Sequence, residues 1–286
     1  MAISVRPLGV VGAELSDVQL ADCTDDDVSM IRRLLGEHGV VFFRNQELSA
    51  EQHIAVARRF GSINVNRFFT AHPAHPEIAL VVKEPEDVGN IGGAWHTDHS
   101  YDPEPALGSI LVARELPPTG GDTLFASMAA AYAALDDATK EEIGTLRAVH
   151  SARHLFGSET VVYGEGNDDY EGRLGNASEA DALEDSVHPI VIAHPISGKS
   201  TLYVNPAFVI GVVGMEREAA FELLHRLYEH ASAERFVHRF EWKPGSVAFW
   251  DNRAVWHNAL NDYPGHRRVM HRITVDGTPL EAFAAA

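Results

Sequence analysis

Apolar and polar positions near the N-terminus predict two helices, each with a clear start. Thr24 precedes three aspartates, which is typical of a capped helix start with acids that complement the helix dipole. This first helix is predicted over residues 25–38, and Gly39 ends it. Ser49 then begins a second predicted helix that ends at Gly61.

Short strand-like apolar runs recur along the chain and are separated by turns. They cover residues 40–43, 123–125, 189–193, 201–204, 246–250 and 267–275. Further helices are predicted in the alanine-rich stretch from Ser127 and over residues 215–230. Many short strands joined by turns favour a mainly β fold, a barrel or double-sheet jelly roll with flanking helices. There is no internal repeat or linker, so we expect a single domain over residues 1–286.

The segment of residues 157–186 differs from its surroundings. It is acidic, rich in Gly and Asn, and lacks apolar periodicity. Loops of this length in compact domains are usually functional lids or insertions, so we expect a lid or insertion loop here.

The composition limits the classes of partner. A length of 286 residues with 45% hydrophobic content is enough for a full core, but a net charge of −18 makes binding to a phosphate backbone unfavourable. We therefore expect no nucleic-acid partner. An acidic protein also repels small anions, so an anionic substrate would need positive charge concentrated at its site.

Cysteine usage and hydropathy bear on location. Cys23 is the single cysteine, so an internal disulfide and a thiolate metal site are both excluded, and any metal must be bound through nitrogen and oxygen. No run approaches the roughly 18 apolar residues of a membrane span, and the N-terminus lacks a basic segment followed by an apolar run. We expect a cytoplasmic protein that does not contact membranes.

The first candidate for chemistry is His96-Thr97-Asp98. In an extended chain, residues two apart project to the same face, so His96 and Asp98 could meet one metal ion. This spacing is a weak indication alone, because 16 histidines should produce about one such pair by chance. An ordinary buried or surface histidine is the alternative interpretation.

His257 makes the pattern more specific, because it follows an apolar strand and precedes Arg268 by a short interval. Two imidazoles and one carboxylate suit non-haem Fe(II) and leave positions open for a cosubstrate and oxygen. Zinc hydrolases can use similar ligands, so the three residues alone leave the metal open. A zinc hydrolase is disfavoured because no candidate general base stands beside them.

Two arginines of the last predicted strand favour iron. Arg268 and Arg272 share one strand face, and two guanidiniums on an inward face need anionic partners. Either arginine could simply pair with one of the many acids. Beside a metal site, however, a guanidinium offers a bidentate grip on the far carboxylate of a dicarboxylate that chelates the metal. The hydroxyl of Thr123 could donate to the same carboxylate.

These tracts carry a resemblance to a known family. WHTD, TGGDTLF and FWDNRAVWHNALNDYPGHRRVMHRIT resemble the taurine dioxygenase and aryloxyalkanoate (2,4-D, phenoxypropionate) dioxygenase family of Fe(II)- and 2-oxoglutarate-dependent oxygenases. The similarity extends over nearly the whole chain, including PLGVVGAEL, VVFFRNQ and HPISGKSTLYVN. It implies a double-stranded β-helix core, which is a cupin-like jelly roll.

The resemblance also implies roles for the metal-site residues. His96, Asp98 and His257 would bind Fe(II), and Arg268 and Thr123 would hold 2-oxoglutarate. The retained Asp98 implies hydroxylation rather than halogenation.

The substrate pocket is implied in less detail. Arg272 would hold the prime substrate, and Phe156 and Phe208 fall where aromatic residues of the family line the pocket. At Asn66, Phe69 and Gly92 the chain lacks the polar residues of the taurine enzymes, which implies a roomier and more apolar pocket.

The expected reaction is hydroxylation of a C–H bond of a small anionic substrate by O2, with succinate and CO2 as coproducts. An aryloxyalkanoate-like acid ranks first. Alkyl sulfates or sulfonates and amino-acid derivatives are the alternatives within the family, and a non-catalytic sensor of small acids is the alternative outside enzymes. By analogy with relatives we expect a homo-oligomer, either a dimer or a tetramer.

Overall fold

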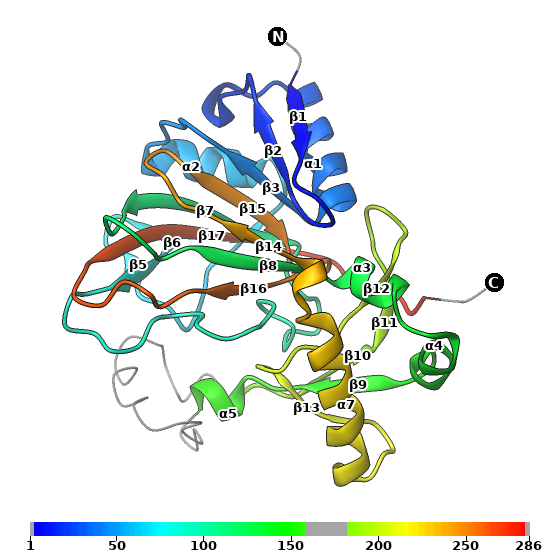
Figure 1. The fold of residues 1–286 in the computed structure, drawn as a ribbon. Coiled ribbons are helices and arrows are strands. Elements are labelled where there is room, and N and C mark those ends of the chain that lie inside the picture. The colour runs from blue at the N-terminus through cyan, green and yellow to red at the C-terminus, as the bar shows by residue number, and fades with distance from the viewer. Residues whose placement is uncertain (1–2, 158–181, 284–286) are drawn as a thin grey trace.

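A large mixed sheet forms the centre of the computed structural model, which describes residues 3–157 and 182–283 (Figure 1). Its strands lie in the order β1-β2-β3-β15-β7-β17-β6-β5, and β4 pairs with β17. Only the β2–β3 pair is parallel within this sheet. The strands are β1 (Ser4–Pro7), β2 (Ala13–Ser16), β3 (Val40–Phe43), β4 (Ile63–Asn64), β5 (Ala71–His72), β6 (His75–Lys83), β7 (Gly108–Glu115), β15 (Val247–Asp251) and β17 (Arg268–Val275).

A second sheet packs against the large one. Its strands lie in the order β14 (Val237–Phe240), β8 (Thr123–Ser127) and β16 (Val255–Ala259). Aromatic side chains fill the space between the two sheets: the ring centroids of Phe42 and Phe240 are 4.0 Å apart, and Phe125 meets Phe42 edge-on. This is the double-sheet architecture that the strand pattern predicts.

Helices α1 (Asp25–His38) and α2 (Ala50–Arg58) contribute to the core on the other face of the large sheet. Thr24 and Ser49 cap them, each through a reciprocal capping box. Their apolar residues pack with Phe60, Ile110 and Phe249.

The remaining elements form a third region beside the two sheets. Helices α3 (Met128–Ala133) and α7 (Arg217–Ala231) pack here on small sheets, and Figure 1 shows this region below and to the right of the main sheets. The other elements described are α4 (Asp137–Ile143), α5 (Arg153–Phe156), β9 (Arg147–His150), β10 (Ser186–Pro189), β11 (Val191–Ala193), β12 (Ser200–Leu202), β13 (Val209–Val212) and the 3-10 turns Leu20–Asp22 and Glu234–Phe236.

Several sequence predictions need correction. The run at residues 189–193 is not one strand, because β10 ends at Pro189 and β11 begins at Val191. The second helix ends at Arg58, before Gly61. Residues 158–181 of the predicted lid lie outside the described residues, and the segment ends earlier than predicted because Ser186 already pairs in β10.

Within residues 3–157 and 182–283, no helix is both long enough and apolar enough to cross a membrane.

Candidate metal centre

The backbone brings the three predicted metal ligands together. His257 lies in the middle of β16, and an isolated bridge joins it to His96: the His96 N–H donates to the His257 carbonyl at 3.1 Å, and the reverse bond measures 2.8 Å. The chain is extended at His96 but turns at Asp98, and His99 follows with a φ of 57°. The prediction of an extended chain through Asp98 was therefore wrong in its backbone, although the side chains still converge.

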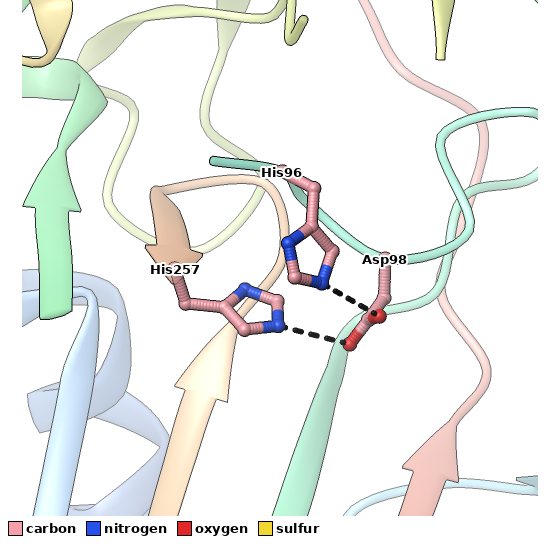
Figure 2. A group of neighbouring side chains, drawn as sticks. All are labelled: His96, Asp98 and His257. Atoms are coloured by element: carbon pink, nitrogen blue, oxygen red, sulfur yellow. Dashed lines mark ion pairs between the residues drawn. The ribbon is translucent and has the colours of Figure 1, made fainter. Parts of the chain in front are cut away.

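The side chains of the two histidines point at the carboxylate of Asp98 (Figure 2). His96 Nε2 lies 3.8 Å from Asp98 Oδ1, and His257 Nε2 lies 3.7 Å from Asp98 Oδ2. All three ligand atoms lie within 4.8 Å of one another, and no other group of this kind occurs among the described residues. Two imidazoles and a carboxylate converging in this way can share one ion and leave other positions open.

Neighbouring groups orient these ligands. His96 Nδ1 lies 2.8 Å from the Ala94 carbonyl, an arrangement in which Nδ1 carries the proton and leaves Nε2 free to bind a metal. The Ser109 hydroxyl donates to Asp98 Oδ2 at 3.2 Å, and the Trp250 ring packs 4.7 Å from the His257 ring. Ser109 lies on β7, a strand that the sequence analysis did not predict.

The charge states of the ligands suit a metal. Burial alone would raise the pKa of Asp98, but Arg272 and the neighbouring histidines bring it well below its usual range. Burial, aided by His96, lowers the pKa of His257 well below its usual value. At neutral pH the site therefore presents a carboxylate and a neutral buried imidazole, which are the protonation states that bind a cation.

Arg268 lies buried with free hydrogen-bonding capacity. Its side chain is 4% exposed, and its Nε and Nη2 have no hydrogen-bond partner among the described residues. Gly121, with a φ of +72°, approaches so closely that an added Cβ would lie 3.2 Å from Arg268 Nε. Burial lowers the pKa of Arg268, yet a guanidinium stays protonated in proteins. An unpaired buried cation of this shape fits a carboxylate.

Thr123 has a hydroxyl hydrogen that can be donated near Arg268. Its Oγ1 accepts a hydrogen bond of 3.0 Å from the indole of Trp242, whose ring lies 5.8 Å from Arg268 Cζ. Because an indole N–H can only donate, the hydroxyl hydrogen of Thr123 is left available for an acceptor. The sequence analysis missed Trp242, which lies outside the motifs that it singled out.

Arg272 lies on the same buried face of β17 as Arg268, as the strand alternation predicted. Its Nη1 donates to Asp98 Oδ1 at 3.0 Å, and its guanidinium lies 4.3 Å from the centre of the Phe69 ring. Its Nε has no partner among the described residues. The predicted contact with substrate stays a prediction, and the observed partner is the carboxylate of the metal site.

Comparison with known proteins identifies the family. Residues 4–274 match the model described as "Taurine catabolism dioxygenase TauD, TfdA family". The chain belongs to this family. Membership confirms the predicted enzyme class, a 2-oxoglutarate-dependent non-haem iron dioxygenase, ahead of the zinc hydrolase and the sensor.

Individual relatives of the dioxygenase match most or all of its length. The chain is 34% identical to the alpha-ketoglutarate-dependent 2,4-dichlorophenoxyacetate dioxygenase of Cupriavidus pinatubonensis, with 96% of each chain covered. It is 30% identical to the (S)-phenoxypropionate/alpha-ketoglutarate-dioxygenase of Sphingobium herbicidovorans, with 100% of this chain and 99% of the relative covered. An alpha-ketoglutarate-dependent sulfonate dioxygenase of Saccharomyces cerevisiae is 32% identical over 92% of this chain, which spans 64% of that relative.

Solved structures confirm the predicted jelly-roll fold. A taurine dioxygenase from Burkholderia xenovorans superposes with a TM-score of 0.81 at 33% identity, covering 99% of this chain and 93% of the other. AAD-2 in complex with Mn(II) and N-oxalylglycine gives a TM-score of 0.79 at 30% identity, covering 99% and 100%.

The predicted aromatic residues of the dioxygenase pocket gather in one cluster. Phe69, Phe156 and Phe208 pack with Phe68 and Tyr101. Ring centroids are 4.5 Å apart for Phe68 and Phe156, and 4.9 Å apart for Tyr101 and Phe208. The sequence analysis missed Phe68 and Tyr101, whose positions next to Phe69 and shortly after Asp98 were the available indications.

Asn66 and Gly92 have structural roles that the sequence analysis did not foresee. The Asn66 amide oxygen accepts the N–H groups of Phe68 and Phe69, and its nitrogen lies 3.2 Å from His99 Nε2, so its polar atoms hold the loop that carries Phe69. Gly92 lies against His96, a candidate metal ligand, because an added Cβ would stand 3.2 Å from His96 Cε1. Because Gly92 has no side chain, the His96 ring can lie close to its backbone.

Proposed function

We propose that this dioxygenase hydroxylates a C–H bond of a small organic anion, with an aryloxyalkanoate-like acid as the preferred substrate. Succinate and CO2 are the coproducts. The observation that carries the proposal is the convergence of His96, Asp98 and His257. Arg268 supports it, because it shares a buried face of β17 with Arg272, which bonds Asp98, and its Nε and Nη2 have no hydrogen-bond partner among the described residues. Relatives in the family are named for sulfonates, sulfate esters and aryloxyalkanoates.

In this proposal the residues of the chain bind and orient the reactants. His96, Asp98 and His257 hold Fe(II), and Arg268 with Thr123 grips the far carboxylate of 2-oxoglutarate. Iron and cosubstrate, when bound, supply the oxidising chemistry together with O2. The buried surroundings keep bulk water away, and fixed positions for the reactants account for much of the rate that the protein contributes.

Arg272 and the aromatic cluster support an aryl acid as the substrate. The guanidinium of Arg272 lies between the carboxylate of Asp98 and the face of Phe69, where charge and aromatic surface meet. An aryloxyalkanoate has the same two parts, a carboxylate and a ring. A guanidinium also binds sulfates and sulfonates, so an alkyl sulfate is the second candidate, favoured by a 32% identical relative named alkylsulfatase from Acinetobacter baylyi.

A substrate panel tests the proposal. The protein is supplied with Fe(II), 2-oxoglutarate and air together with aryloxyalkanoates, alkyl sulfates, sulfonates or N-acyl amino acids, and succinate formation is measured. We expect the highest kcat/KM with an aryloxyalkanoate. Turnover of sulfates or sulfonates alone would overturn the substrate class, and substrate-dependent succinate from none of the four classes would overturn the proposed reaction on small anions.

A further inference from the structure

A second buried cation, Lys83, stands directly opposite Arg268. In the register of β6 and β17, Lys83 pairs with Arg268, and directly paired residues of antiparallel strands place their side chains on the same face. Lys83 is 4% exposed, as is Arg268, and its ammonium nitrogen has no hydrogen-bond partner among the described residues.

This arrangement is electrostatically unfavourable as it stands. Like charges directly opposite each other destabilise a strand pair, and a buried charge without a partner costs several kcal/mol. Two nearby acids already have partners: Asp122 and Asp262 both receive hydrogen bonds from Arg239, and Asp262 also accepts the Gly121 N–H.

The aromatic neighbour of Lys83 offsets only part of this cost. Its ammonium lies 4.8 Å from the centre of the ring of Tyr263, a buried residue. A cation–π contact contributes about 2 kcal/mol at most when it is desolvated, and it leaves the hydrogen-bond donors of the ammonium unused. Two cations on one buried face, with donors that have no hydrogen-bond partner among the described residues, therefore favour the binding of an added anion.

We propose that Lys83 is a further binding residue for the cosubstrate and that it grips the distal carboxylate of 2-oxoglutarate together with Arg268. This inference rests on the proposed function, in which Arg268 holds that carboxylate. Its consequence is selectivity: two cations on one buried face favour a 2-oxo acid with a second carboxylate over one that ends in a methyl group.

The test compares two ligands that differ only at the distal end. The Mn(II)-loaded protein, which cannot turn over, is titrated by calorimetry with 2-oxoglutarate and with 2-oxopentanoate, in the wild type and in Lys83→Met. We expect the substitution to weaken 2-oxoglutarate binding by roughly 10-fold to 100-fold, the range for a charge-assisted hydrogen bond, and to leave 2-oxopentanoate binding within about twofold. Lys83→Arg should retain part of the preference for 2-oxoglutarate.

Thermal unfolding of the ligand-free protein provides a readout that is independent of ligand binding. If the Lys83 ammonium binds an anion only when the ligand is present, removing this charge from the ligand-free protein should leave the Tm unchanged or raise it. If Lys83 instead serves only to support Tyr263, the Tm should fall. Lys140→Met is the matched control, because Lys140 also lies over a tyrosine ring, 5.8 Å from Tyr132, but on α4.

The outcomes separate the inference from the function on which it rests. Unchanged 2-oxoglutarate affinity in Lys83→Met, or an equal loss of affinity for both ligands, would overturn the role of Lys83 while leaving the proposed function intact. A lowered Tm with unchanged affinity would assign the lysine to packing. A wild-type protein that fails to bind 2-oxoglutarate would instead refute the proposed function itself.

Discussion

The two buried arginines of β17 differ in how their charges are balanced. Arg272 donates to the carboxylate of Asp98 at 3.0 Å, so its charge has a partner within the protein. Arg268, two alternations earlier on the same face of β17, has two nitrogens without hydrogen-bond partners among the described residues and lies opposite a second cation, Lys83. At one end of the strand the arginine bonds a carboxylate of the protein, and at the other end no carboxylate among the described residues bonds the arginine.

This difference shows how a site can be prepared for a ligand at a cost to the fold. A paired buried charge contributes to holding the Asp98 carboxylate in place, whereas unpaired buried cations destabilise the ligand-free protein. A ligand that neutralises them stabilises the folded state, by about 2.7 kcal/mol at a concentration 100 times its Kd. Binding of 2-oxoglutarate should therefore stabilise the folded protein mainly through Arg268.

The largest expected effect comes from replacing Asp98, which is both a proposed metal ligand and the ion-pair partner of Arg272. Asp98→Ala should lower turnover by roughly 1,000-fold or more, because the ion loses one of three protein ligands. It should also leave Arg272 buried and uncompensated, at about 3 to 5 kcal/mol of unfolding free energy. Iron content, succinate formation and urea unfolding measure these effects.

Asp102→Ala is the control for Asp98→Ala. It removes two other contacts near the site, the ion pair of Asp102 with the partly exposed Arg67 at 3.3 Å and the contact of Asp102 with His99 Nδ1 at 2.9 Å. None of the proposed ligands is replaced, so Asp102→Ala should lower stability but retain the metal. Full iron occupancy and activity in Asp98→Ala would contradict its assignment as a ligand.

At the other end, Arg268→Met should raise the concentration of 2-oxoglutarate required for half-maximal rate by roughly 100-fold, because the cosubstrate carboxylate loses its bidentate partner. Its neighbour Arg267 provides a control of the same chemistry. Arg267 is exposed and pairs with Glu84 at 2.8 Å, so Arg267→Met should change the requirement by less than about twofold. Equal effects of the two substitutions would show that net charge, rather than the Arg268 contact, controls cosubstrate binding.

Arg272→Met should have an intermediate and selective effect. We expect kcat/KM for the prime substrate to fall by roughly 30-fold, as for the loss of a charge-assisted hydrogen bond, while decarboxylation of 2-oxoglutarate without substrate stays within about threefold of wild type. Succinate formation with and without substrate separates the two. A parallel loss of both activities would indicate that Arg272 acts only by holding Asp98.

Local signals explain what the sequence could predict. The capping residues Thr24 and Ser49 and the apolar run of β3 act within a few residues, so α1, the start of α2 and β3 follow from the sequence. The convergence of the metal ligands was also predictable, because the residue types and their order restrict the chemistry.

Long-range pairing explains what the sequence analysis missed. Strands β6, β7 and β16 were not predicted, and the register of β6 on β17, which sets Lys83 against Arg268, depends on segments that lie far apart in the sequence. The turn at Asp98 depends on the positive φ of His99, which composition does not reveal. The predicted oligomer, the absence of nucleic-acid binding and the cytoplasmic location stay predictions.

Another buried basic residue, His53, extends the comparison to a group that can lose its charge. Its Nε2 lies 3.2 Å from the Ile110 carbonyl between α2 and the large sheet, and Nδ1 has no partner among the described residues. Burial, with a smaller contribution from Arg114, lowers the pKa of His53 from 6.5 to about 3. Unlike Arg268, this side chain can therefore be buried without its proton.

The smallest predicted effect follows from this pKa. Below pH 6.5 the unfolded chain takes up a proton that folded His53 does not accept until about pH 3, so stability is complete above pH 6.5 and falls as the pH drops through this window. The slope is about 1.4 kcal/mol per pH unit. The free energy of unfolding, measured by urea titration, should therefore fall less in His53→Gln than in the wild type as the pH drops from neutral to mildly acidic. At one pH unit below 6.5 the two losses should differ by about 1.4 kcal/mol. His225→Gln, at an exposed histidine on α7, should leave the slope unchanged, and an equally steep loss in His53→Gln would assign the acid sensitivity to other buried groups.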